Sequence, residues 1–340
     1  AGRVAEDIVH ALSEAFVVNG QTSFLSASVG IAVYPQDGNS AEALIKNADT
    51  AMYRAKSGGR ARSVYFKESM NLEAVERVTL DRELRKAIDQ GELELHYQPQ
   101  LDLRSGQIVC AEALMRWRHP RLGLVLPGRF IPVAEEFGYI EQIGRWLLRE
   151  ACMQVKTWQA DGLRISQLAV NISAMQFRRS DLVDYIRECT LQSGIAPENL
   201  DLEITETVLM DRGSDVERML RDLAAMGVSI SLDDFGTGFS SLAYLKRFPF
   251  RKVKIDRGFV DGLGRDSDSE AIVSAIVAMS HALGKAVVAE GAETGEQTAV
   301  LRRVGCDGVQ GYHVARPLPA AEFAALVRAR EKTDRAVGQN

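Results

Sequence analysis

Cysteine and histidine are scarce in this sequence, and their spacing excludes several kinds of site. The 340 residues include four cysteines that lie far apart without a C-x-x-C pair, and five histidines without an i, i+4 pair. A structural zinc site or a disulfide framework would need a closer grouping. We therefore expect reduced thiols buried in the core of a cytoplasmic protein. These thiols belong to Cys110, Cys152, Cys189 and Cys306.

Long apolar stretches and runs of basic residues are also missing. No segment approaches the roughly eighteen consecutive apolar residues of a membrane span, and no secretory signal opens the chain. The net charge of −5 and the lack of a polybasic tail argue against a protein that coats nucleic acid. We expect a soluble, cytoplasmic chain that does not bind a nucleic-acid polymer, although an upstream region of a longer protein could carry a membrane anchor.

Apolar, strand-like runs alternate with amphipathic helical stretches from Asp89 onward. Eight such strands in about 240 residues fit a closed (β/α)₈ barrel of the TIM type, an α/β fold. An open doubly wound sheet is the alternative, but no G-x-G-x-x-G turn follows the first strand. The strand-like runs read ELELHYQPQL, IVCAEALMRW, LAVNIS, LDLEIT, VSISLDD, KVKID, AVVAEG and GVQGY.

The residues before this alternation form a different region. Residues 1–67 predict two helices, a strand and a short closing strand, which is too little for a sheet domain with its own full core. Residues 68–90 contain neither proline nor glycine and predict a connecting helix. We therefore expect a partial α+β domain at 1–67, the connecting helix at 68–90, the barrel at 91–330 and a tail at 331–340.

Polar residues gather at the late positions of the strand-like runs. In a (β/α)₈ barrel, these positions form the mouth at which the chemistry takes place. Two adjacent ionised aspartates would repel each other by roughly 4 kcal/mol at an effective dielectric near 20, so Asp233 and Asp234 require a bound cation, a shared proton or exposure to water. The late polar residues are Glu112, Arg116, Asn171, Glu203, Asp233, Asp234, Lys254, Asp256, Glu290 and Gln310.

Six carboxylates gathered at one mouth, with amides and a lysine ammonium among them, predict a site for hard divalent cations. Oxygen ligands from Asp, Glu and Asn suit Mg²⁺, Mn²⁺ or Ca²⁺, and no histidine or thiolate is placed to favour zinc. Two such ions about 3.5–4 Å apart are the usual apparatus for displacing an oxygen at phosphorus. Each acid taken alone fits a solvated rim residue, Lys254 alone could neutralise one acid, and Gly236 and Gly238 fit a tight turn as well as a phosphate loop.

With these residues placed, the sequence resembles the EAL family of cyclic di-GMP phosphodiesterases from about residue 92 to 328. The stretch EALMRW contains the signature tripeptide Glu112-Ala113-Leu114. The other matching motifs are YQPQ, RFIPVAEEFGYI, VNISAMQF, LEITET, DDFGTGFSSLAYL, KIDRGFV, VVAEGAET and QGYHVARPLP, in that order.

The resemblance implies roles for individual residues. It implies one cation held by Glu112, Asn171, Glu203 and Asp233, and a second held by Asp233 and Asp234 with Glu290 as ligand or base. Lys254 would lie beside the attacking water, Asp256 would orient that region, and Glu206 would anchor the loop after DDFG. Gln98, Leu114, Arg116, Asp234, Glu293 and Gln310 would contact the dinucleotide. Hydrolysis would give linear pGpG.

The N-terminal piece resembles the second half of a GGDEF diguanylate cyclase domain. SASVGIAVYPQDG and LIKNADTAMYRAKSGGR carry this likeness, whereas the GGDEF signature itself is absent. We therefore expect no synthesis of cyclic di-GMP, and a longer protein with a sensor and a cyclase-like domain upstream.

Two further hypotheses remain beside the enzyme. One is a catalytically silent receptor for cyclic di-GMP, and the other is a scaffold that acts through protein contacts; both would predict lost metal ligands. For the enzyme we expect Mg²⁺ or Mn²⁺ as cofactor, two ions per site, with Ca²⁺ inhibitory because its coordination is longer and looser. The resemblance also implies a homodimer formed through the barrel.

Overall fold

The computed structural model describes residues 1–18, 21–59, 61–210, 214–236 and 242–337. The chain forms two compact units, Ala1–Leu84 and Arg85–Asn340, and each is described by itself. Within the described residues, no helix is both long enough and apolar enough to cross a membrane.

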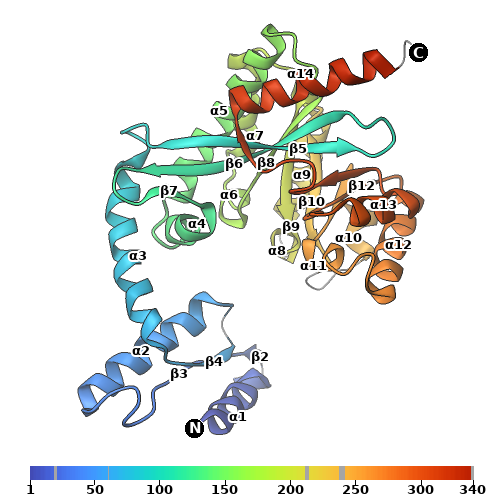
Figure 1. Cartoon of the computed structure of the whole chain (residues 1–340). Helices are drawn as coiled ribbons and strands as arrows, with labels where there is room; N and C mark the ends of the chain where they lie inside the picture. Colours follow the sequence, from blue (N-terminus) through green and yellow to red (C-terminus); the bar gives the residue numbers. More distant parts are fainter. Residues whose placement is uncertain (19–20, 60, 211–213, 237–241, 338–340) are drawn as a thin grey trace. The chain divides into compact units, whose positions relative to one another are not determined.

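The second unit is built on eight strands that close into a barrel (Figure 1). Around the ring, each strand is hydrogen-bonded to the next in the order β5, β13, β12, β11, β10, β9, β8, β6 and back to β5. The barrel predicted from the sequence is therefore confirmed. Its strands are β5 (Leu93–Asp102), β6 (Ile108–His119), β8 (Gln167–Asn171), β9 (Leu200–Thr205), β10 (Ser229–Phe235), β11 (Lys252–Ile255), β12 (Ala286–Ala289) and β13 (Gly308–Gln310).

The first strand of the barrel runs opposite to the others, which differs from the all-parallel (β/α)₈ arrangement expected. β5 is antiparallel to both of its neighbours, β6 and β13. The link from β5 to β6 holds only residues 103–107, and Gly106 turns there with φ 72°. A parallel pair needs a crossover of a dozen or more residues, so a link this short permits only a hairpin.

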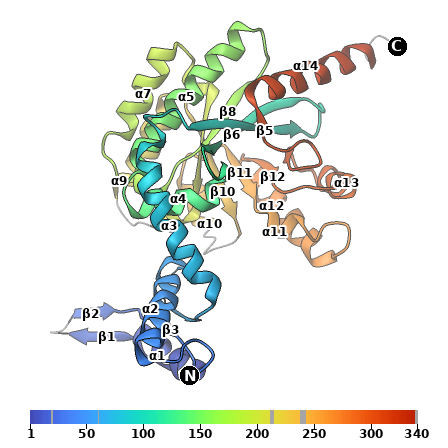
Figure 2. The ribbon, with the colours of Figure 1, turned by 60° about the vertical axis from the view of Figure 1, so that its left-hand side comes forward.

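Helices surround the barrel (Figure 2), and the two short outer strands β7 (Gly123–Val125) and β14 (Leu318–Pro319) extend the sheet. The final helix, α14, packs against β5 and continues to Val337, past the expected start of a tail at residue 331. The helical elements of this unit are α4 (Pro127–Glu136), α5 (Ile140–Ala160), α6 (Ala174–Phe177), α7 (Leu182–Ser193), the 3₁₀ turn Pro197–Asn199, α8 (Glu206–Met210), α9 (Ser214–Ala225), α10 (Leu242–Arg247), α11 (Arg257–Val260), α12 (Ser267–Ala282), α13 (Gly295–Arg303) and α14 (Ala320–Val337).

The two faces of the barrel wall differ in chemistry, because side chains alternate along a strand. On β9, Leu200, Leu202 and Ile204 belong to the apolar core between the strands and the helices. Asp201 and Glu203 lie between them in sequence and contact lysines of β11. Since β10 separates β9 from β11 in the sheet, these contacts cross the barrel interior. The interior is therefore polar, and the apolar core lies outside it.

The first unit contains three helices and two small sheets. Strands β3 (Ser28–Ile31) and β4 (Arg62–Tyr65) pair in parallel, and a Cβ on Gly30 would lie 1.9 Å from the Ala48 carbonyl oxygen, so helix α2 packs directly on β3. An antiparallel hairpin of β1 (Ala15–Val18) and β2 (Gln21–Phe24) was not predicted from the sequence. The helices are α1 (Gly2–Ser13), α2 (Ala41–Ser57) and α3 (Glu68–Ala87), the last ending three residues before the expected end of the connecting helix.

Candidate active site

The inward-facing residues at one end of the barrel line a hollow of about 230 Å³. This end is formed by the carboxyl ends of the parallel strands, as the sequence predicted for the mouth. The hollow brings together residues of β5, β6, β10 and β13 with residues that follow β11 and β12. Seven of the predicted site residues line it: Gln98, Glu112, Leu114, Asp233, Glu290, Glu293 and Gln310.

A fully buried lysine lies at the floor of the site. The Lys254 ammonium is 2.7 Å from Glu203 Oε2 and 2.6 Å from Glu290 Oε1. Its other two carboxylate contacts are Asp233 Oδ1 at 3.3 Å and Glu112 Oε2 at 3.6 Å. Four carboxylates and one ammonium carry a formal charge of −3 when all the acids are ionised, so one lysine cannot balance the group.

Burial and the excess negative charge change the pKa values of the groups around Lys254. Burial, followed by the charge of Glu112, raises the pKa of Glu203. Burial also raises the pKa of Glu290, to about 8. Burial acts to lower the pKa of Lys254, but Glu112, Glu203 and the other acids outweigh it and the pKa is raised. Without another cation the cluster retains protons, and a divalent cation would take their place.

The adjacent aspartates reach the mouth together because the strand is irregular between them. Neighbouring residues of a regular strand point to opposite faces, but the pairing of β10 with β11 shifts between Leu232 and Phe235. Asp234 has φ 54°, in the left-handed region that non-glycine residues seldom occupy. As a result, one carboxylate oxygen each from Asp233, Asp234 and Glu290 lies within 4.8 Å of the others.

An amide network surrounds the remaining acids. Asn171 Nδ2 donates to Glu112 Oε1 at 2.6 Å, and Gln310 Nε2 donates to Glu112 Oε2 and to Gln98 Oε1. Burial acts to raise the pKa of Glu112, but Lys254 and these amides outweigh it and the pKa is lowered. Glu112 is therefore held as a carboxylate.

The donor set fits a hard cation. Glu203 Oε1 is buried, and no hydrogen-bond donor among the described residues reaches it, which leaves an acceptor that a cation can satisfy. Rotating the Asn171 side-chain amide by half a turn would present Oδ1 where Nδ2 now lies. Asp233, which is buried, and Asp234 and Glu290, which are half-buried, offer three further carboxylates. Carboxylate and amide oxygens are the ligands that Mg²⁺ and Mn²⁺ prefer.

Three predicted residues contact backbone groups. Glu206 Oε1 accepts from the Gly236 N–H at 3.2 Å, at the start of the DDFG loop whose residues 237–241, Gly238 included, lie outside the described residues. Asp256 caps α11 by accepting from the Gly258 N–H at 2.9 Å. Arg116 is buried on β6 and donates to the Met115 carbonyl at 2.7 Å, and the structure does not bring it into the lining of the hollow.

Two side chains that line the hollow were not predicted. Arg257 lines it and pairs with Glu293 at 2.9 Å. Tyr312 also lines it, and the Arg316 guanidinium lies 4.1 Å from the centre of the Tyr312 ring. Arg257 and Tyr312 each lie two residues beyond the end of a strand, β11 and β13 respectively. A search of the loops after each strand, and not of the strand ends alone, would have found them.

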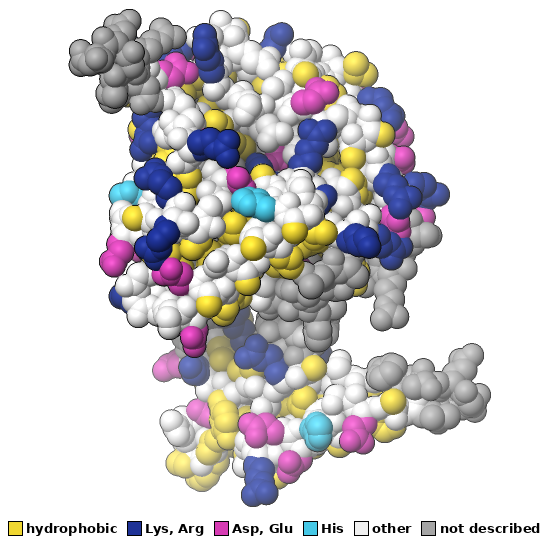
Figure 3. All heavy atoms as spheres, turned by 90° about the vertical axis from the view of Figure 1, so that its right-hand side faces the viewer, with side chains coloured by type: hydrophobic (Ala, Val, Ile, Leu, Met, Phe, Trp, Pro, Cys, Tyr) yellow, Lys and Arg dark blue, Asp and Glu magenta, His cyan; other side chains and the backbone are white. Residues whose placement is uncertain are grey.

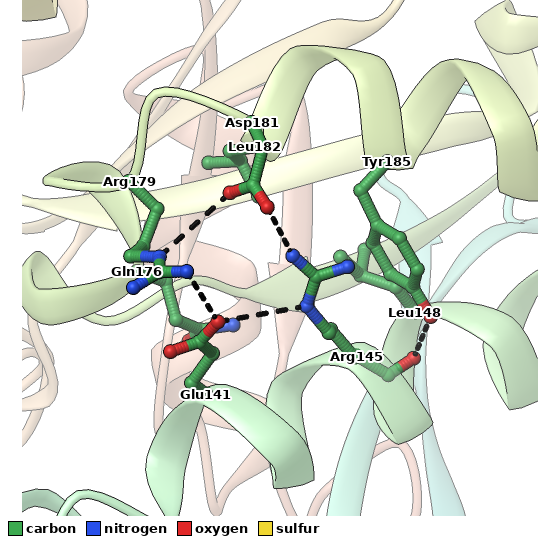
Figure 4. A pocket seen from close by; sticks show the side chains of 8 residues that line it. All are labelled: Glu141, Arg145, Leu148, Gln176, Arg179, Asp181, Leu182 and Tyr185. Carbon is green, nitrogen blue, oxygen red and sulfur yellow. Dashed lines mark hydrogen bonds and ion pairs between the residues drawn. The ribbon is translucent and has the colours of Figure 1, made fainter.

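A second pocket lies outside the barrel, between α5 and α7 (Figure 4). Arg145 lies 2.5 Å from Asp181 and stacks over the Tyr185 ring, and Arg179 lies 3.0 Å from Glu141. The volume of about 20 Å³ holds about one water molecule. Its charges are balanced by their neighbours, so the barrel mouth is the better candidate site.

On the face that Figure 3 draws, the lysine and arginine side chains of described residues are interspersed with acidic, apolar and uncharged ones and form no basic stripe. The four carboxylates around Lys254 lie instead at the barrel mouth.

The chain matches two known families. Residues 81–317 match the EAL domain family, and residues 1–62 match the family described as diguanylate cyclase, GGDEF domain. Both resemblances drawn from the sequence are confirmed.

Two of the similar proteins are named as cyclic di-GMP phosphodiesterases. The bifunctional diguanylate cyclase/cyclic di-GMP phosphodiesterase MucR of Pseudomonas aeruginosa is 46% identical over 327 residues, which cover 96% of this chain and 48% of MucR. The cyclic di-GMP phosphodiesterase PdeR of Escherichia coli is 38% identical over 300 residues, which cover 88% of this chain and 45% of PdeR. The chain thus spans about half the length of these relatives.

Solved structures show the same fold. The phosphodiesterase PaMucR in complex with c-di-GMP superposes with a TM-score of 0.70 at 47% identity, covering 72% of this chain and 99% of that one. The EAL enzyme Bd1971, in a form bound to cAMP and cyclic di-GMP, superposes with a TM-score of 0.71 at 34% identity, covering 75% of this chain and 69% of that one.

Proposed function

The chain belongs to the EAL domain family, and from this premise we propose that its barrel mouth hydrolyses one phosphodiester bond of cyclic di-GMP to give linear pGpG. The observation that carries the proposal is the buried Lys254 among four carboxylates, next to the group of Asp233, Asp234 and Glu290. Such an excess of oxygen ligands suits an enzyme that works with hard divalent cations.

Two cations complete the proposed site. Glu112, Asn171, Glu203 and Asp233 would hold one, and Asp233, Asp234 and Glu290 would hold the other. When bound, the ions supply Lewis-acid activation of the water nucleophile and stabilisation of the charge on the phosphoryl oxygens. We propose Mg²⁺ or Mn²⁺ in this role.

The side chains around the cations have separate tasks. Lys254 keeps its proton, because its raised pKa lies far above neutral pH, and so stabilises negative charge that develops at phosphorus. Glu290, with a pKa raised to about 8 in the free site, is suited to exchange a proton with the attacking water. Asp256 holds the start of α11, and Glu206 holds the start of the DDFG loop.

The substrate would lie across the hollow. Leu114 offers apolar contact, Gln98 and Gln310 offer amide groups, and Glu293 lies at the rim. We propose that Arg116 binds a phosphate after its guanidinium turns away from the Met115 carbonyl, since a planar fork of donors matches phosphate oxygens.

Product analysis tests this function. The protein is incubated with cyclic di-GMP and Mg²⁺ or Mn²⁺, and the nucleotides are separated by chromatography, with a sample in excess chelator as control. We expect conversion to pGpG that depends on the cation. Cyclic di-GMP that stays intact although it binds would overturn the enzyme and support the receptor.

The assembly is a separate proposal. We propose, on the family resemblance alone, that the barrel forms a homodimer, and light scattering at several protein concentrations measures its mass. A monomer over the whole range would contradict the dimer and leave the chemistry of the site unaffected.

A further inference from the structure

A second carboxylate–ammonium pair lies beneath the proposed cation site. Asp201 Oδ2 is 2.8 Å from Lys252 Nζ, and two residues further along the same strands Glu203 Oε2 is 2.7 Å from Lys254 Nζ. Both pairs join β9 to β11 across the barrel interior. We call Asp201 and Lys252 the lower pair, and Glu203 and Lys254 the upper pair. The proposed reaction uses the upper pair alone.

The lower pair is held rigidly by strand β10. The Ser231 hydroxyl lies 2.8 Å from each carboxylate oxygen of Asp201, and neither residue is exposed to solvent. Asp201 therefore has partners on both oxygens, whereas Glu203 Oε1 is reached by no donor among the described residues. The lower pair is satisfied within the protein, and the upper pair is left with capacity for a ligand.

The charges of the lower pair act on Glu203 with opposite signs. The carboxylate of Asp201 is among the groups that raise the pKa of Glu203, after burial and the nearer acids. Burial acts to lower the pKa of Lys252. Cys110, Asp201 and then Glu203 outweigh burial, and the pKa of Lys252 is raised. Because Lys252 is paired with Asp201 at 2.8 Å, its ammonium is engaged by Asp201 and not by Glu203.

We propose that Asp201 and Lys252 are positioning residues for the cation site, because their fixed pairing occupies the Lys252 ammonium and leaves Glu203 turned toward Lys254. This inference rests on the proposed function. Without Asp201, the ammonium of Lys252 would draw the Glu203 carboxylate down and compete with Lys254. Without Lys252, the buried carboxylate of Asp201 would be left without its cation two residues from Glu203 on the same strand, and it would repel the Glu203 carboxylate.

A double-mutant cycle tests the pair. The variants are Asp201→Asn, Lys252→Met and the two combined, and the measurements are Mn²⁺ binding by calorimetry without nucleotide and kcat/KM with cyclic di-GMP. We expect each single change to weaken Mn²⁺ binding by about ten- to a hundredfold, the usual effect of losing a partner that orients a ligand. The double variant, which has no unpaired charge, should recover most of that loss.

Ser231→Ala provides a milder variant in case a single change prevents folding. It removes the two contacts to Asp201 and keeps both charges, so we expect a loss of Mn²⁺ affinity of about two- to fivefold. Ile230→Val is the matched control, because it trims a fully buried side chain on the opposite face of β10. It should lower the melting temperature and leave Mn²⁺ affinity unchanged.

The outcomes separate the two proposals. Single variants that melt earlier but bind Mn²⁺ as tightly as the wild type would overturn the positioning role and leave the proposed function standing. A double variant as weak as the worse single variant would overturn the charge compensation in the same way. A wild-type protein that binds no Mn²⁺ and leaves cyclic di-GMP intact would overturn both.

Discussion

The ammonium of Lys254 lies 2.7 Å from Glu203 Oε2, and at most 1% of either side chain is exposed to solvent. This pair joins two strands that are not neighbours in the barrel wall. It therefore contributes both to the interior of the barrel and to the proposed chemistry at its mouth, and its removal should affect the two properties differently.

Lys254→Met should make stability dependent on metal. Loss of one partner of a buried ion pair costs about 3–5 kcal/mol, so we expect a large drop in melting temperature in chelator and substantial recovery with Mn²⁺. Turnover should fall by at least about a hundredfold, since charge stabilisation at phosphorus is lost. Thermal melts followed by circular dichroism and product assays measure both. Lys246→Met, on the exposed surface of α10, is the control.

Glu112→Ala and Asp233→Asn should each abolish turnover, because each removes a proposed cation ligand. We expect a loss of more than about a hundredfold in kcat/KM, measured by separating the nucleotides. Glu188→Gln removes a carboxylate from the exposed surface of α7 and should have no effect. Wild-type rates in either purified site variant would refute the ligand assignment.

Asp234→Gly and Asp234→Ala should separate backbone strain from cation binding. Both remove the carboxylate, so both should weaken cation binding equally in calorimetry. At φ 54°, glycine has no steric penalty and alanine does, so the glycine variant should be the more stable by about 1 kcal/mol in denaturant unfolding. Equal stability of the two variants would show that the left-handed conformation is not maintained.

Calcium should inhibit the reaction. Ca²⁺ takes six to eight ligands at longer distances than Mg²⁺, so it should occupy the carboxylates without holding two oxygens in line at phosphorus. We expect rates with Mg²⁺ to fall as Ca²⁺ is added and to recover when Mg²⁺ is raised. Equal rates with either ion alone would count against a two-cation displacement.

The cysteines should not react while the protein is folded. Burial raises the pKa of Cys110, Cys152 and Cys306 to about 12, so at pH 8 only about one thiol in ten thousand is a thiolate. The unfolded chain, with thiols of ordinary pKa near 8.5, loses protons earlier, and stability should therefore decline as pH rises above about 8.5. A disulfide reagent should label no thiol at pH 8 until denaturant is added; rapid labelling of the native protein would contradict this.

Most of the barrel strands could be predicted from the alternation of apolar and polar residues along each strand. Runs such as LDLEIT alternate apolar and polar residues because one face packs under helices and the other lines the interior, and the observed strand β9 has the predicted bounds. The direction of β5 could not be predicted in the same way. An alternating pattern is the same whether the strand is read forwards or backwards. Only the length of the link between β5 and β6 decides whether these two strands are parallel or antiparallel.

The candidate site was predictable in composition and less so in geometry. Late polar residues on several strands indicated the acids around Lys254, but the convergence of Asp233 and Asp234 depends on a strand irregularity that no residue type announces. The lower pair, Asp201 and Lys252, was not predicted from the sequence, for another reason. Asp201 and Lys252 lie at the beginnings of their strands, where a charged residue normally indicates exposure to solvent.

The reversal of β5 also decides where the chain enters the barrel. Leu93, the first residue of β5, is paired with Trp117 near the far end of β6, so the peptide that leads into the barrel arrives at the catalytic rim and not at the base. The same strand carries Gln98 on its way from that rim, so a residue that lines the hollow lies five positions along the chain from the entry point.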